Sequence, residues 1–193
     1  MVTTYNRHFD RSMIIIHPGE FYASREDLII STVLGSCISI ILHDPVLGYC
    51  GMNHFMLPGE LRQTAIHEAA SGRYGIQAME LLINDMLGKG SRKPDLVAKV
   101  FGGGHVIAND STNSIPGSNI RFAFQFLESE NIPLISHDTG GTCGRKILLF
   151  TADSRVLLKR FHGATVNKTI ASETRYLKDL QALQADPPDI TLF

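Results

Sequence analysis

The chain has 193 residues, of which 44% are hydrophobic and 19% are charged, and its 18 basic and 19 acidic side chains leave a formal net charge of −1. A chain of this length fits one domain with a sizeable core, and the composition is typical of a soluble globular protein. With so little net charge, the protein has no overall field to attract nucleic acid or an anionic membrane surface.

The N-terminal half reads as a series of short strands. After a loose lead-in over residues 1–11, apolar runs bounded by Gly, Pro or Asp predict four strands, over 13–16, 27–32, 38–43 and 49–57. The last two form the best hairpin candidate, because Asp44-Pro45 starts a turn that Gly48 helps to close. The polar stretch 59–72 is expected to be a surface loop.

The C-terminal half alternates helices with further strands. Apolar residues at helical spacing predict three helices, over 74–87, 119–130 and 171–183. Further strands are expected over 96–101, 134–136, 146–151 and 156–160. Many strands interrupted by two or three helices predict an α/β (α+β) layered single domain, with mixed or antiparallel sheets flanked by the helices. An unstructured tail is expected from residue 186.

The three cysteines, Cys37, Cys50 and Cys143, are an odd number without metal-ligand spacing. They favour free thiols in a reducing compartment over a disulfide framework. No apolar run approaches the roughly 18 residues of a membrane span, and the first one is too short for the core of a signal peptide. We therefore expect a cytoplasmic protein that does not insert into a membrane.

The glycine run Gly102-Gly103-Gly104 follows a predicted strand, but it has neither the period of a dinucleotide-binding loop nor the lysine of a phosphate-binding loop. A triple glycine after a strand instead predicts that another segment of backbone packs closely against it. The eight histidines show no paired ligand spacing. Neither a metal nor another cofactor is therefore expected.

Cys37 is the best candidate for a reactive residue. Gly35 and Ser36 make a tight turn before it, so that the backbone N–H groups of Ser36 and Cys37 can point outward. Such groups would lower the pKa of the thiol and hold an oxyanion. The alternative is that Cys37 only fills the core, as most buried cysteines do; Cys50 and Cys143 are interpreted in that way.

His54 is the candidate base for this thiol. In the predicted hairpin, residues lie opposite each other when their numbers sum to about 91, which places Cys37 opposite His54. A thiol and an imidazole on neighbouring strands form the minimal activated nucleophile. A third group normally fixes the imidazole tautomer. Ser31 and Thr32 are the candidates, and a difference of one residue decides which of them faces inward.

These residues lie in motifs that resemble the chemoreceptor glutamine deamidases of the CheD family. The motifs appear in the family's order: TVLGSC (32–37), HDP (43–45), GMNHFMLP (51–58), RYG (73–75), AMELLI (78–83), KVFGGG (99–104), the region of Asn119, and DTGG-x-x-GRK (138–146). The resemblance implies a deamidase domain over 1–165, followed by a C-terminal helix and tail over 166–193. It also implies that Cys37 is the nucleophile, that His54 is the base, and that Ser31 stands where the family has threonine; Thr32 stays the alternative.

The reaction implied by the resemblance is the hydrolysis of a glutamine side chain in the cytoplasmic helical region of a chemotaxis receptor. Cys37 would form a thioester and release ammonia, the N–H groups of Ser36 and Cys37 would hold the oxyanion, and water would release glutamate. The alternative is a non-catalytic chemotaxis adaptor that binds and stimulates a CheC-type phosphatase. A third reading is transglutaminase chemistry, in which an amine replaces water. Retention of both Cys37 and His54 favours the deamidase.

Overall fold

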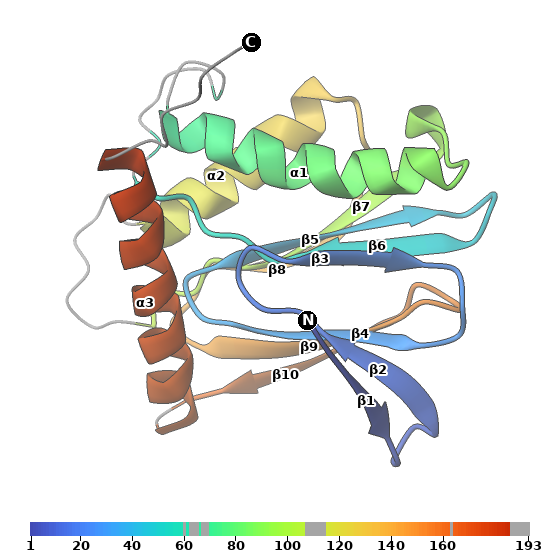
Figure 1. Cartoon of the computed structure of the whole chain (residues 1–193), viewed down its shortest axis with the longest axis horizontal. Coiled ribbons are helices and arrows are strands. Elements are labelled where there is room, and N and C mark those ends of the chain that lie inside the picture. The colour runs from blue at the N-terminus through green and yellow to red at the C-terminus, as the bar shows by residue number, and fades with distance from the viewer. Residues whose placement is uncertain (60, 62–65, 67–69, 107–114, 163, 186–193) are drawn as a thin grey trace, which may run out of the picture.

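Three layers make up the part of the chain that the computed structural model describes, which comprises residues 1–59, 61, 66, 70–106, 115–162 and 164–185. Helices α1 (Ala70–Gly88) and α2 (Ile115–Ser129) cover the outer face of one five-stranded sheet, and a second five-stranded sheet lies against its other face (Figure 1). A third helix, α3 (Ala164–Ala185), runs along the strand ends at one side of both sheets. The predicted layered α+β domain is confirmed.

The two sheets draw their strands from both halves of the chain. The sheet away from α1 and α2 has, in order, β1 (Val2–Asn6), β2 (Arg11–Ile15), β4 (Ile29–Leu34), β9 (Gly144–Phe150) and β10 (Val156–Phe161). The sheet beneath the helices has, in order, β3 (Phe21–Ser24), β6 (Tyr49–Asn53), β5 (Ile38–Asp44), β7 (Val97–Gly102) and β8 (Leu134–Thr139). Each sheet contains one parallel pair, β2 with β4 and β7 with β8, and the other pairs are antiparallel.

All eight predicted strands and all three predicted helices are confirmed, with shifted boundaries. The expectation of a loose lead-in over 1–11 is wrong, because β1 pairs with β2 along its whole length. β1 and β3 are not among the strands predicted from the sequence. β1 is largely exposed, so its sequence lacks the alternation of polar and apolar residues that indicates a strand, and β3 is only four residues long. Most of the expected loop 59–72 and the tail from 186 lie outside the described residues. Among the described residues, no helix has the length and apolar character needed to cross a membrane.

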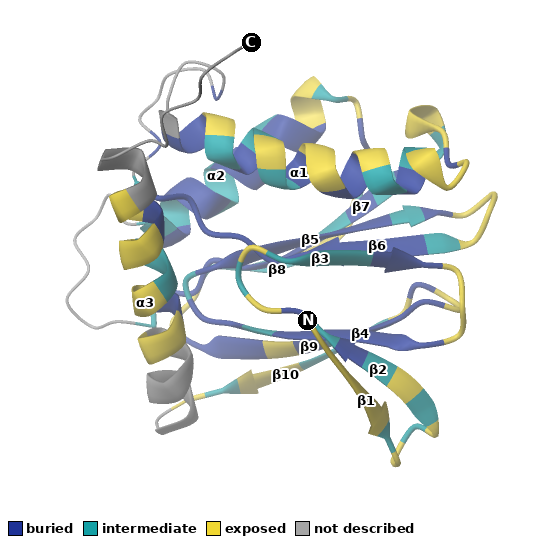
Figure 2. Cartoon of the chain, viewed as in Figure 1, coloured by how far each residue is buried: buried dark blue, intermediate teal, exposed yellow. Residues whose placement is uncertain are grey.

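The central strand β5 is buried on both faces, which explains its almost continuous apolar sequence (Figure 2). Since successive residues of a strand point to opposite faces, Ile38 and Ile40 belong to the core beneath α1 and α2. Cys37 and Ile41 belong to the core between the two sheets. The fold therefore places the candidate nucleophile between the sheets, at the start of a central strand.

Candidate active site

The β5–β6 hairpin places Cys37 and His54 on the same face of their sheet. A bridge pairs Ile38 with Phe55 and the hairpin keeps that register, so the numbers of paired residues sum to 93. The predicted sum of about 91 is wrong by two residues, because the Asp44 carboxylate accepts hydrogen bonds from two N–H groups of a longer, four-residue loop. A shift by two residues keeps each side chain on its face, so Cys37 and His54 are diagonal neighbours instead of opposite ones.

The triple glycine at the end of β7 packs against the turn that carries Cys37. The Gly103 N–H donates to the Cys37 carbonyl at 2.7 Å, and the Gly104 N–H donates to the Gly35 carbonyl at 2.8 Å. A Cβ added to Gly102, whose φ is +114°, would lie 2.3 Å from the Cys37 carbonyl oxygen. The predicted close approach of another backbone segment is confirmed, and it holds the turn from its carbonyl side.

Thr32 holds the His54 ring from β4. Thr32 Oγ1 lies 2.7 Å from His54 Nδ1, and it donates its own hydrogen to the Ile16 carbonyl oxygen at 2.8 Å. Because that hydroxyl hydrogen is already used, Nδ1 carries the hydrogen of the bond between Thr32 and His54. Nε2 then keeps its lone pair; it is buried and has no hydrogen-bond partner within the described part of the chain. The ring is therefore ready to accept a proton from a nearby thiol.

Ser31, the neighbour of Thr32, lies on the other face of β4. Leu34 belongs to the core between the sheets, and Thr32 shares its face by alternation. The Ser31 side chain therefore points away from His54. The structure brings Cys37, His54 and Thr32 together and does not bring Ser31 to them.

A glutamate from α3 fills the space in front of the turn. Glu173 is 3% exposed, and its Oε1 accepts the N–H of Gly35 at 2.7 Å and of Cys37 at 3.3 Å. Its Oε2 accepts the N–H and the hydroxyl of Ser36, each at 2.7 Å. The predicted N–H groups of Ser36 and Cys37 do point outward, and they already hold an anion.

The donor atoms of Cys37, His54 and Glu173 lie within 4.8 Å of one another. A thiolate, an imidazole and a carboxylate are ligand types that zinc accepts. However, a carboxylate has four lone-pair positions, and the four donors of the turn fill those of Glu173. The cluster therefore fits an anion-binding site better than a metal centre.

Burial keeps both reactive groups neutral. It raises the pKa of the Cys37 thiol well above its ordinary value, and the Glu173 carboxylate raises that pKa further. Burial also lowers the pKa of His54 to about 3, and the neighbouring His17 adds to this effect. The prediction that the turn's N–H groups lower the pKa of the thiol is wrong for this state, because burial and Glu173 outweigh the backbone hydrogen bond.

Comparison with known proteins relates this site to a family. The family model for "CheD chemotactic sensory transduction" matches residues 56–160, more than half of the chain. The chain belongs to the CheD family. A "Probable chemoreceptor glutamine deamidase CheD" of Janthinobacterium sp. (strain Marseille) is 42% identical over 178 residues, which cover 92% of this chain and 88% of that protein. A protein with the same name from Agrobacterium fabrum is 46% identical over 158 residues, which cover 81% of this chain and 84% of that protein.

Asn119, which lies within the segment matched by the CheD family model, links the two halves of the site. Its Nδ2 donates to the Ser36 carbonyl at 2.9 Å, and its Oδ1 accepts the Leu57 N–H at 2.8 Å. The side chain is fully buried, so both bonds are shielded from water. Asn119 thereby ties the turn before Cys37 to the segment that follows His54, a role that the sequence motif alone does not reveal.

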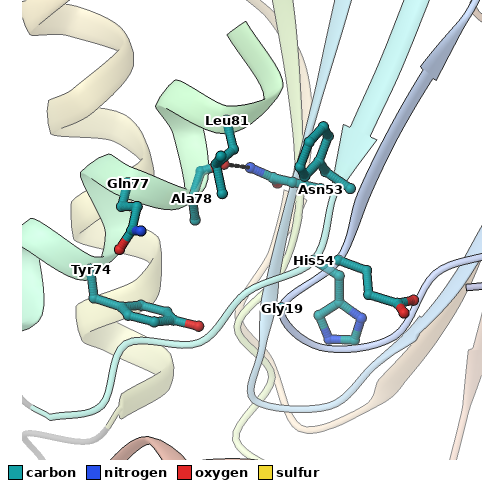
Figure 3. Close-up of a pocket in the computed structure, with 9 residues that line it drawn as sticks. Gly19, Asn53, His54, Tyr74, Gln77, Ala78 and Leu81 are labelled. Atoms are coloured by element: carbon teal, nitrogen blue, oxygen red, sulfur yellow. Dashed lines mark hydrogen bonds between the residues drawn. The ribbon is translucent and has the colours of Figure 1, made fainter. Parts of the chain in front are cut away.

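A pocket opens beside His54, between α1 and the loop that carries Gly19 (Figure 3). Tyr74 of α1 lines this pocket and forms a hydrogen bond with the hydroxyl of Tyr176 on α3. Helix α3 therefore borders both the turn of Cys37 and the pocket of His54. It begins after residue 160, where the match to the CheD family model ends.

Proposed function

We propose that this chain is a chemoreceptor glutamine deamidase, which hydrolyses side-chain amides of receptor glutamines to glutamates and releases ammonia. The observation that carries the proposal is the buried pair of Cys37 and His54 beside a set of N–H groups that binds a carboxylate. The names of the CheD relatives support the same reaction and the same substrate.

The first half of the reaction forms a thioester. His54 Nε2 takes the proton of the Cys37 thiol while Sγ bonds to the amide carbon of the glutamine. The carbonyl oxygen becomes an oxyanion, which the N–H groups of Ser36 and Cys37 stabilise. The His54 imidazolium then protonates the amide nitrogen, the C–N bond breaks, and ammonia leaves.

Water completes the reaction. His54 Nε2 takes a proton from the water molecule as its oxygen attacks the thioester carbon, and the same N–H groups hold the second oxyanion. The C–S bond then breaks, and the Cys37 sulfur recovers its proton from His54. We assign the orienting role to Thr32 and not to Ser31, because Thr32 is the residue that contacts His54 Nδ1.

The substrate also suggests where the protein works. The glutamines lie in the cytoplasmic helical region of the receptors, so we propose a cytoplasmic protein. The free thiols of Cys37, Cys50 and Cys143 fit a reducing compartment. A CheC-type phosphatase stays a predicted partner, which rests on the family resemblance alone.

Intact-mass measurement on a purified receptor cytoplasmic fragment tests the proposal. The wild-type protein should add about one mass unit per modified glutamine, because hydroxyl replaces the amide NH2, and Cys37→Ala should add none. Cys50→Ala is the matched control, since Cys50 is also fully buried in the core between the sheets, and it should remain active. A receptor fragment left unchanged by the folded wild type would contradict the proposal.

A further inference from the structure

The turn before Cys37 binds the side chain of Glu173 as it would bind a ligand. The carboxylate is buried, and burying a charge is costly unless hydrogen bonds compensate it. Three N–H groups of the turn and the Ser36 hydroxyl supply these bonds. The site therefore has a specific place for a glutamate carboxylate, within 4.8 Å of the Cys37 sulfur.

A glutamate side chain is also the product of the proposed reaction. After hydrolysis, the carboxyl carbon next to Cys37 carries one oxygen from the original amide and one from water. The amide oxygen would still lie at the N–H groups that held the oxyanion. In Glu173 each of these two N–H groups holds one carboxylate oxygen, Oε1 at the N–H of Cys37 and Oε2 at the N–H and hydroxyl of Ser36. Its carboxylate lies where a product would lie before release.

The rest of α3 is seated like a helix in a groove. Side chains that turn toward the protein follow Glu173 at Tyr176, Leu177 and Leu180, which are steps of three, four and seven residues. The Tyr176 ring packs on Gly19, where an added Cβ would lie 2.8 Å from the Tyr176 hydroxyl oxygen. The groove therefore accommodates a single helix face with a carboxylate at one position and apolar side chains after it.

We propose that α3 is a tethered product mimic, which occupies the groove of the receptor helix with Glu173 in place of the reacting glutamine. This inference rests on the function proposed above. It defines the substrate as a glutamine on an α-helix, with apolar side chains three or four and seven residues toward its C-terminal end. It also accounts for a nucleophile that is 0% exposed, because the receptor helix must displace α3 to reach Cys37.

The substitution Glu173→Gln tests the inference, because it places an amide at the reacting position. Cys37 should attack the amide carbon of residue 173, ammonia should leave, and water should restore a glutamate. Peptide mass spectrometry of the variant should find glutamate at 173, and the variant produced by cell-free synthesis in ¹⁸O-labelled water should carry one atom of ¹⁸O in that side chain. The double variant Cys37→Ala/Glu173→Gln should keep glutamine. Gln181 on the same helix, which is exposed, should remain glutamine in both proteins.

The outcomes separate this inference from the proposed function. If residue 173 stays glutamine in a variant that still deamidates the receptor fragment, α3 is not a product mimic and the deamidase proposal stands. If residue 173 stays glutamine and the folded wild type also leaves the receptor fragment unchanged, the deamidase proposal fails and the mimic fails with it. Conversion at 173 that depends on Cys37 supports both.

A second measurement tests whether α3 competes with the receptor helix. Glu173→Ala removes the bonds to the turn, so Cys37 should react with iodoacetamide about tenfold faster or more, because charged hydrogen bonds of this kind are strong. Deamidation of the receptor fragment should also accelerate. Asp179→Ala, at an exposed acid on the same helix, should change neither rate. If Glu173→Ala instead abolished deamidation as Cys37→Ala does, Glu173 would be a catalytic group and the product mimic would be refuted.

Discussion

Replacing Thr32 by valine tests how the His54 ring is oriented. The change keeps the shape of the side chain and removes the hydroxyl that lies 2.7 Å from His54 Nδ1. Both residues are buried, so water does not replace the lost partner, and an unsatisfied buried donor costs about 1–3 kcal/mol. This cost falls on the tautomer that presents the Nε2 lone pair to Cys37, so the rate of deamidation should fall about 5- to 150-fold.

The assay is the initial rate of mass gain on a receptor fragment, with the melting temperature of each variant measured in parallel. Ser31→Ala is the matched control, because it removes the neighbouring hydroxyl from the other face of β4 and should leave the rate within about twofold of the wild type. Thr32→Ser restores a hydroxyl and should recover most of the activity. Wild-type activity in Thr32→Val, or a slower rate in Ser31→Ala than in Thr32→Val, would refute the assignment of Thr32.

Two further predictions concern stability. Burial lowers the pKa of His54 from 6.5 to about 3, so below pH 6.5 the unfolded chain binds a proton that the folded protein excludes. The free energy of unfolding should therefore decrease as the pH falls, by about 2 kcal/mol between pH 7 and pH 5 from His54 alone. In urea titrations, the free energy of unfolding of His54→Gln should depend less on pH than that of the wild type. An equal pH dependence in the two proteins would contradict the assignment of this effect to His54. Gly102→Ala introduces a Cβ 2.3 Å from the Cys37 carbonyl oxygen at a φ of +114°, and it should destabilise the protein by about 3 kcal/mol or more. Gly117→Ala is the control: its new Cβ meets nothing within 4 Å, so the variant should be as stable as the wild type or up to about 1 kcal/mol more stable. Equal melting temperatures of the two glycine variants would contradict the conclusion that Gly102 is required for close packing against the Cys37 carbonyl.

The alternation of side chains along β5 and β6 suffices to predict that Cys37 and His54 share a face. The assumed register is wrong by two residues, but such an error does not change the face of any side chain. The same alternation does not decide between Ser31 and Thr32. Both are buried hydroxyl residues, so the inward face of β4 becomes known only from the strands and the sheet that pack against it.

Glu173 shows why part of the site could not be predicted. It lies 136 residues after Cys37 in the sequence, and its contact depends on where α3 docks, which no local pattern encodes. One signal was present, since Glu173 shares the helical spacing of Tyr176 and Leu180, and a charged side chain on a buried face requires a partner. The wrong prediction for the pKa of Cys37 has the same origin, because it omitted the carboxylate beside the thiol.

With α3 as a product mimic, binding of the receptor helix and activation of the Cys37 thiol occur in the same step. With α3 docked, burial and the Glu173 carboxylate both oppose formation of the thiolate. A glutamine amide carries no charge, so a receptor helix that takes the place of α3 removes the opposing carboxylate while the site stays buried. The thiol of Cys37 then ionises more readily as the amide arrives, and the newly formed glutamate carboxylate raises its pKa again. The docked carboxylate that blocks the groove therefore also keeps the thiol protonated, and a protonated thiol resists oxidation and alkylation until the substrate is in place.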